Sequence, residues 1–282
     1  MTFPQPYKKL ETKYHLVQFE AEGVLRISFN RPPVNAWSDA DDSDVAAVVL
    51  SGEGRCFTAG LDLKSNELFE VLANIEDTGR RAFAVHSHIK HFQAAISSIE
   101  KCAKPVIAAA HGIAYGLGID LLSACDIRYV ASCAKLSIRA TCYLPTSICH
   151  PQEVDIGLAA DIGTLQRFPK VIGNDSVARE LAYTARIFDA QYAQSIGFVS
   201  KVTEAGQAAV VAAALATAKE IASKSPVAVQ SSKAILIHAR DHPVDDGLAF
   251  TAAWNAAMLQ TEDIPIATQA VMAKQTPKFS KL

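Results

Sequence analysis

Short apolar runs that alternate with longer helical stretches constrain the fold of this chain more than any other feature. Residues 46–51 and 106–110 are apolar runs bounded by polar stretches, which is typical of buried parallel strands. Residues 78–101 lie between them and have the length and pattern of a helix. A second helical stretch, 119–125, leads to a further strand at 127–130. This alternation predicts an α/β fold with crossover connections.

The two ends of the chain differ from this alternating middle. Residues 15–20 and 24–30 alternate and are rich in Val, Phe, Leu and Ile, which predicts a half-buried strand pair. Near the other end, Ala-rich periodic stretches separated by turn signals predict helices at 207–223, 226–239, 244–260 and 262–274. We therefore expect an α/β core over residues 1–205 and a helical region over residues 206–282. The apolar faces of these helices are expected to pack on the core and on a partner subunit.

Composition excludes several classes of protein. The 282 residues are 50% hydrophobic and 20% charged, which is enough to bury a large core. Lys plus Arg number 27 against 29 Asp plus Glu, so no net field favours nucleic acid as a partner. The six cysteines form no CxxC pair, which argues against a zinc site or a disulfide scaffold. The longest uncharged run, 105–119, is too short to span a membrane as a helix.

Three acidic residues are the strongest candidates for chemistry. Asp120 follows a glycine turn, and Glu153 and Asp161 lie eight positions apart, each among small and apolar residues. Burial of a carboxyl group favours its neutral form and raises its pKa toward the range useful for acid–base catalysis. Two such groups can take up one proton and deliver another. For Asp161 an alternative remains open, because an aspartate before this helical stretch is also a good N-cap.

Two glycine-containing loops could supply N–H donors to a developing negative charge. Residues 56–64 follow the strand at 46–51, and Gly116 and Gly118 flank the start of a helix whose first N–H groups lack intrahelical partners. One N–H from each loop would form an oxyanion hole that stabilises a thioester enolate. The candidate residues are Ala59, Gly60, Leu61, Asp62, Leu63, Leu117 and Gly118. Nearby, Asp126 and Arg128 suit a structural ion pair or backbone brace better than a catalytic dyad.

Five motifs together carry a family resemblance. They are Asn-Arg-Pro-Pro-Val-Asn at 30–35, Phe-Thr-Ala-Gly-Leu-Asp-Leu at 57–63, and the segments 111–120, 124–129 and 153–167. They closely resemble the enoyl-CoA hydratase/isomerase (crotonase) superfamily. The resemblance implies a β-β-α spiral core, a C-terminal helical trimerisation region, and a homo-trimer or homo-hexamer. It also implies an acyl-CoA thioester substrate held at the two oxyanion loops, with coenzyme A as part of the substrate and no metal or separate cofactor.

Within the superfamily, the acid set is similar to that of the Δ3,5-Δ2,4-dienoyl-CoA isomerase branch. Hydratases carry glutamates at the positions of Asp120 and Glu153 and a glycine at that of Asp161. The resemblance implies that Glu153 and Asp161 move the protons and that Asp120 is a polar support. The pathway would be β-oxidation or, as a lower-ranked alternative, fungal synthesis of polyunsaturated fatty acids for toxins. Two other functions stay open: an enoyl-CoA hydratase, and a catalytically impaired subunit that binds CoA.

Two departures from the family pattern motivate the alternative of a catalytically impaired subunit that binds CoA. Residues 30–44 contain two prolines and four aspartates and no apolar face, where the family has an amphipathic crossover helix. Residues 140–152 form an insertion directly before Glu153. Either the enzyme has diverged or the splice boundaries of its gene are misplaced.

The final three residues form a targeting motif. Ser280-Lys281-Leu282 matches the C-terminal signal that a peroxisomal import receptor reads. We therefore expect a peroxisomal location.

Overall fold

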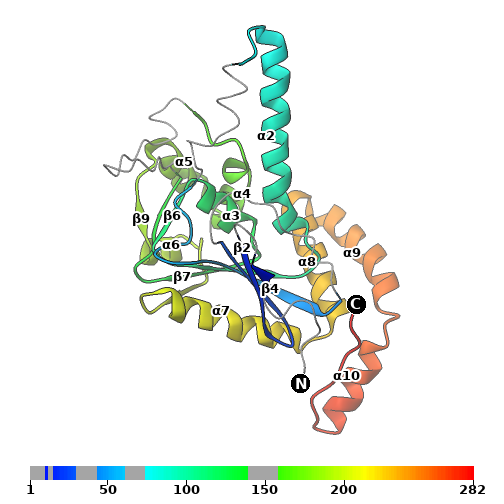
Figure 1. Cartoon of the computed structure of the whole chain (residues 1–282). Coiled ribbons are helices and arrows are strands. Elements are labelled where there is room, and N and C mark those ends of the chain that lie inside the picture. The colour runs from blue at the N-terminus through cyan, green and yellow to red at the C-terminus, as the bar shows by residue number, and fades with distance from the viewer. Residues whose placement is uncertain (1–9, 12–14, 30–42, 61–73, 139–157) are drawn as a thin grey trace.

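The computed structural model describes residues 10–11, 15–29, 43–60, 74–138 and 158–282, and its centre is a mostly parallel sheet (Figure 1). The strands β3, β4, β5, β7 and β10 run parallel to one another, and β1, β2 and β3 are joined by antiparallel pairing. The strand order is β1-β2-β3-β4-β5-β7-β10. The bounds are β1 Leu10–Glu11, β2 His15–Ala21, β3 Gly23–Phe29, β4 Val45–Gly52, β5 Val106–Ala110, β7 Ile127–Ala131 and β10 Lys201–Thr203.

The sequence pattern explains where these strands lie. All of β5 and almost all of β4 are buried, because helices cover both faces of the central strands. The expected strands at 15–20, 24–30, 46–51, 106–110 and 127–130 are thereby confirmed over their described residues. A smaller sheet of β6 (Ile113–Tyr115), β8 (Lys135–Ser137) and β9 (Phe188–Asp189) stands beside the main one.

Helices of the first part of the chain cover one face of the sheet. Helix α2 (Thr78–Lys101) has the predicted bounds and begins at Asp77, whose carboxylate accepts a hydrogen bond from the Arg80 N–H at 2.8 Å. Only Ile96 and Ile99 of α2 are buried, so this helix packs through its C-terminal end and projects from the body (Figure 1). The other helices on this part are α3 Leu117–Ala124, α4 Thr164–Ile172, α5 Asp175–Thr184 and α6 Ala190–Ser195.

The opposite face of the sheet is covered by α7 (Gln207–Ala222), the first helix of the C-terminal region. Its small buried residues allow the helix to pack closely on the strands. They are Val210, Val211, Ala214 and Ala218, and they lie in one apolar cluster with Val24, Ala47, Val49, Ile107 and Ala109. The first C-terminal helix is therefore part of the hydrophobic core, as expected for a helix that packs on the sheet.

The last three helices, α8 (Pro226–Asp241), α9 (Val244–Met258) and α10 (Asp263–Met272), confirm the predicted helical C-terminal region. Helix α8 is tied to the core by Lys233, whose Nζ lies 2.7 Å from Asp126 Oδ2 and 3.0 Å from the Lys104 carbonyl oxygen. Helix α9 contains no buried residue in the single chain. Large exposed apolar side chains on or beside these helices are Leu236, Val244, Leu248, Leu259, Ile264, Val271 and Met272.

Two expectations lie largely or wholly outside the described residues. The absence of a crossover helix was predicted for residues 30–44, of which the structure describes only 43 and 44. The insertion predicted at 140–152 lies wholly outside the described residues. Among the helices in the described part of the chain, none has both the length and the apolar character needed to cross a membrane.

Candidate active site

The two glycine-containing loops predicted to form an oxyanion hole are in direct contact. The Thr58 N–H donates to the Ile113 carbonyl oxygen at 3.1 Å, which joins the loop after β4 to the segment that leads into α3. A methyl group added at Gly118 would lie 3.1 Å from Thr58 Cγ2 and 3.2 Å from Ala114 Cβ. The absence of a side chain at Gly118 therefore permits this close approach.

The start of α3 presents N–H groups in the way the sequence predicts. Gly116 is the N-cap, with φ of 48°, and no side chain caps the helix there. The N–H groups of Ile119 and Asp120 are the first in this helix to donate to the Gly116 carbonyl oxygen. The N–H groups of Leu117 and Gly118 precede them and lie at the open end of the helix. In the other loop, the Gly60 N–H already donates to Thr58 Oγ1 at 3.2 Å. Gly60 thus shapes the loop, and its neighbour Ala59 is half-buried.

Asp120 is buried beneath this helix start and bound to the beginning of α4. Its Oδ1 accepts hydrogen bonds from the Thr164 N–H at 2.6 Å and from Thr164 Oγ1 at 2.7 Å. Burial raises the pKa of Asp120 to about 6, although the two bonds from Thr164 and the charge of Arg167 oppose this rise. The nearby charge of Asp161 raises this pKa further. Burial therefore favours the protonated form of Asp120 at mildly acidic pH.

Asp161 lies in the turn before α4 and is exposed. The structure places Gly163, not Asp161, at the N-cap of α4. Glycine has no side chain that could accept a hydrogen bond from the first N–H groups of the helix. The bond to the Thr164 N–H comes from Asp120 instead. The alternative that Asp161 caps this helix is therefore wrong, because a partner from α3 occupies that position. The Asp161 carbonyl oxygen accepts a hydrogen bond from Gln93 Nε2 of α2 at 2.7 Å.

The structure thus brings together two of the three predicted acids. Asp120 binds Thr164 at the beginning of α4, and Asp161 precedes Thr164 by three positions in the adjoining turn. Glu153, Leu61, Asp62 and Leu63 lie outside the described residues, so their predicted roles stay predictions. Among the residues that the structure does describe, no group of three His, Cys, Asp or Glu side chains could hold a metal ion.

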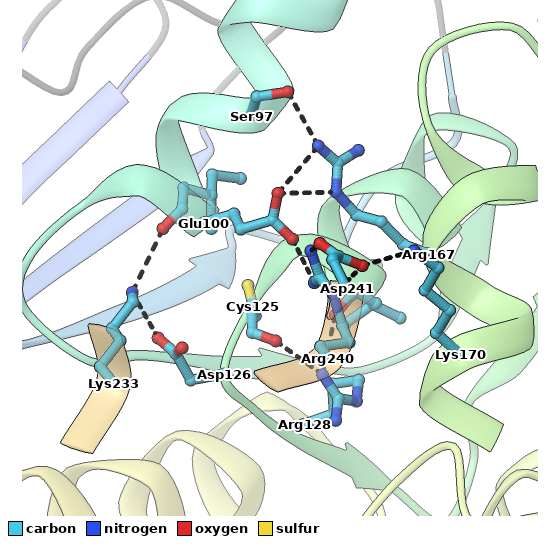
Figure 2. Close-up of polar contacts among 12 residues, drawn as sticks. Ser97, Glu100, Cys125, Asp126, Arg128, Arg167, Lys170, Lys233, Arg240 and Asp241 are labelled. Carbon is cyan, nitrogen blue, oxygen red and sulfur yellow. Dashed lines mark hydrogen bonds and ion pairs between the residues drawn. The ribbon is translucent and has the colours of Figure 1, made fainter. Parts of the chain in front are cut away.

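Asp126 and Arg128 have structural roles, but they are not paired with each other by a hydrogen bond. Arg128 donates to the Cys125 carbonyl oxygen at 2.6 Å and to the Phe198 carbonyl oxygen at 2.7 Å, which is the predicted backbone brace. Asp126 pairs with Lys233 of α8. Figure 2 shows the bond from Arg128 to Cys125 and the pair of Asp126 with Lys233.

Sequence reasoning missed a further group of side chains beside the acids. Arg167 of α4 binds Glu100 and Ser97 of α2, and Glu100 also pairs with Arg240 of α8 (Figure 2). Arg167 and Thr164 both lie in the motif at 153–167, but no local pattern indicated their partners. Their roles become visible only when α2, α3 and α4 are brought together.

Comparison with known proteins gives consistent matches over most of the chain. The model of the family described as enoyl-CoA hydratase/isomerase matches residues 20–281. A mouse protein named mitochondrial Δ(3,5)-Δ(2,4)-dienoyl-CoA isomerase is 45% identical over 276 residues, covering 92% of this chain and 80% of that protein. The Arabidopsis thaliana protein named as the peroxisomal form is 42% identical over 241 residues, covering 85% and 81%.

Solved structures agree with this result. The crystal structure of an enoyl-CoA hydratase from Bacillus anthracis has a TM-score of 0.78 and 27% sequence identity, and the match covers 95% of this chain and 99% of that one. A putative enoyl-CoA hydratase from Streptomyces coelicolor has a TM-score of 0.77 and 26% identity, covering 99% and 96%. The architecture is therefore that of these enzymes.

Proposed function

Because the chain belongs to the enoyl-CoA hydratase/isomerase family, we propose that it isomerises 3,5-dienoyl-CoA thioesters to 2,4-dienoyl-CoA thioesters. The names of the mouse and Arabidopsis relatives support this choice within the family. The observation that carries it is that Asp120, two positions after the Gly118 contact with Thr58, binds Thr164, which follows Asp161 by three positions. The pathway is fatty-acid β-oxidation, with a fungal polyunsaturated fatty-acid route as the lower-ranked alternative.

The reaction needs one proton removed and one proton returned. A carboxylate takes the C2 proton of the thioester, and the electron pair spreads through the diene onto the thioester oxygen. N–H groups from the 59–63 loop and from Leu117 or Gly118 stabilise that oxygen. A carboxylic acid then returns a proton at C6, which leaves a 2,4-diene. We assign these transfers to Glu153 and Asp161, with Asp120 as a polar support; coenzyme A is part of the substrate.

The alternative of an enoyl-CoA hydratase receives less support from the contacts of Asp120. A hydratase must hold a water molecule between two acids. Here one oxygen of Asp120 is already bound by two donors of Thr164. This arrangement suits a fixed support for the start of α4 better than a ligand for a reactive water.

One assay separates the three candidate functions. Purified protein is mixed with 3,5-dienoyl-CoA and, separately, with 2-enoyl-CoA, and the ultraviolet absorbance is followed over time. We expect the first substrate to gain the absorbance of a diene conjugated with the thioester, and the second to change far more slowly. Faster hydration of 2-enoyl-CoA would establish the hydratase instead. Binding of both thioesters without turnover would establish the impaired CoA-binding subunit.

The exposed apolar side chains on the last helices support a homo-oligomer. Helix α9 buries no residue within the chain, and α8, α9 and α10 carry most of the large apolar side chains exposed in this region. Surfaces of this kind mark protein–protein contacts. The assembly is a homo-trimer or homo-hexamer formed through the helical region 206–282, whose first helix also packs on the core region 1–205.

The cellular location follows from the final three residues. The Arabidopsis relative is named as peroxisomal and the mouse relative as mitochondrial, so the family occurs in both organelles. Ser280, Lys281 and Leu282 are exposed, which would allow an import receptor to reach them. The chain is therefore assigned to the peroxisome. Lys281 Nζ lies 2.6 Å from Asp44 Oδ1, so the receptor would have to separate this pair.

Removal of residues 280–282 tests the location. The shortened protein is expected to stay in the cytosol and to keep the turnover and melting temperature of the full chain, because these residues lie outside the packed core. Fluorescence microscopy of tagged chains gives the location, with an Asp44→Asn variant as the control that removes the charged partner of Lys281 and keeps residues 280–282. Import of the shortened chain at the normal level, in cells without the full-length protein, would show that the address lies elsewhere.

A further inference from the structure

We propose that Arg167 is a positioning residue for the isomerisation, because it holds the turn that carries Asp161 against helix α2. This inference rests on the proposed function and extends it to a side chain that touches neither substrate nor reacting atoms. Three independent contacts of Arg167 and its turn support the proposal.

The first contact fixes the guanidinium group of Arg167. Its Nε and Nη2 each lie 3.3 Å from Glu100 Oε2, and Nη2 lies 2.8 Å from Ser97 Oγ. The side chains of Arg167 and Glu100 are only 10% and 14% exposed, so little water competes for these bonds. Because a guanidinium is planar and donates in fixed directions, contact with two residues of α2 sets its orientation as well as its position (Figure 2).

The second contact joins this guanidinium to the turn before α4. Gly163 has φ of 135°, and a methyl group added there would lie 1.9 Å from Arg167 Nη1. The guanidinium therefore occupies the place where any other residue would carry its side chain. Gly163 follows Asp161 by two positions, so the backbone of the acid-bearing turn rests directly on Arg167.

Two further hydrogen bonds hold the same turn at its two ends, one from α2 and one from α3. Gln93 of α2 donates to the Asp161 carbonyl oxygen at 2.7 Å. Asp120 of α3 binds Thr164 at the beginning of α4. The turn is thus held between α2 and α3. Arg167, itself bound to α2, contacts the turn at Gly163, between these two hydrogen bonds. Catalysis tolerates displacements of about 1 Å at most, so an exposed acid such as Asp161 needs this support.

Arg167 also acts on Asp120 through its charge. Two charged groups shift the pKa of Asp120. Arg167 of α4 lowers this pKa, and Asp161 of the preceding turn raises it. Burial and Asp161 both raise the pKa of Asp120. Without the positive charge of Arg167, less would oppose this rise. A change at Arg167 therefore has a distinct electrostatic consequence in addition to any loss of stability.

The test compares Arg167→Met with a matched control, Arg240→Met. Methionine keeps an unbranched apolar side chain and removes the charge and the donors. Arg240 pairs with the other oxygen of the same Glu100, but its side-chain bonds run to Glu100 and Asp241 and not to the turn at 161–164. Both variants thus lose one ion pair of Glu100, and only Arg167→Met loses the contact with the turn.

We expect Arg167→Met to lower kcat about 10-fold or more with KM within about threefold, since misplacement of a reacting group by ~1 Å has effects of this size or larger. Arg240→Met should keep kcat within about twofold even if its melting temperature falls. Arg167→Lys, which keeps the charge without the planar group, should be intermediate. If Arg167→Met is too unstable to purify, Ser97→Ala removes one of the bonds to Arg167 and should give a smaller fall in kcat.

A second measurement does not depend on turnover. Carbon NMR of the labelled Asp120 carboxyl should show its pKa moving above the wild-type value in Arg167→Met and remaining unchanged in Arg240→Met. Equal losses of kcat in the two methionine variants, or a folded Arg167→Met with normal kcat and a normal Asp120 pKa, would overturn the inference. If the wild-type chain does not isomerise dienoyl-CoA, the proposed function fails, whereas the NMR comparison still decides whether Arg167 acts on Asp120.

Discussion

Asp161→Asn is expected to lower the turnover of 3,5-dienoyl-CoA by about 10²-fold or more, because an amide cannot accept and return a proton as a carboxyl group does. Binding of the CoA thioester should change little, since the substitution keeps the size of the side chain. The melting temperature should also change little, because Gly163 is the N-cap of α4 and Asp120 binds its first N–H. Loss of turnover without loss of stability is therefore the expected combination.

Steady-state kinetics and thermal unfolding of the same preparation check this result. Glu153→Gln should reproduce the loss of turnover if both acids move protons. Asp175→Asn serves as the matched control, because it alters an exposed aspartate of α5 that pairs with Arg179. A variant Asp161→Asn that works at the wild-type rate would remove Asp161 from the mechanism. A large fall in its melting temperature would instead assign it a structural role.

Asp120→Asn is expected to make the protein more stable at neutral pH, by up to about 3 kcal/mol. The folded protein raises the pKa of Asp120 from the ordinary value of 3.8 to about 6, so the folded state favours the protonated acid. The contribution of protonated Asp120 to the free energy of unfolding is fully present below about pH 4. This contribution is lost as the pH rises to about 6, where the buried acid ionises. The difference between the two pKa values corresponds to about 3 kcal/mol of destabilisation above pH 6.

Asparagine avoids this cost because it has no charge to bury. Its side-chain oxygen can still accept the two hydrogen bonds from Thr164. Urea denaturation between pH 4 and pH 8 should therefore show a gain for Asp120→Asn that is small at pH 4 and reaches its full size above pH 6. Asp161→Asn alters an exposed group and removes only its small repulsion of Asp120, so it should show a much smaller gain. A gain that is the same at every pH would mean that burial of the charge is not the cause.

The fold could be predicted largely from local sequence patterns. The helix at 78–101 was predicted with its observed bounds from its length and pattern, and the structure shows that Asp77 caps its start. The central strands were predicted because strands covered on both faces consist of continuous apolar residues. The start of α3 was placed two residues late, since Leu117 and Gly118 carry no local signal that separates the turn from the helix.

The candidate site was predicted less completely, because its contacts join distant parts of the chain. A local pattern suggested Asp161 as a helix cap, whereas the carboxylate that performs this role, Asp120, precedes Thr164 by 44 positions. The partners Glu100 and Arg167 are 67 positions apart, and Asp126 and Lys233 are 107 apart. No spacing rule for a single helix or strand relates residues over such distances. The acids themselves were singled out by their small and apolar surroundings, and the family motifs suggested their roles.

The position of α7 on the sheet also determines the order in which the chain can complete its fold during synthesis. Strands β3, β4 and β5 leave the ribosome well before residues 207–222, which in the described part of the chain supply the helix side of the apolar cluster that contains Val24, Val49 and Ile107. Until then Val24, Val49 and Ile107 lack the helix that covers them in the finished protein. A nascent chain therefore carries an apolar sheet face for the time needed to add about a hundred residues. A transiently exposed apolar face of this kind is prone to aggregation until α7 covers it.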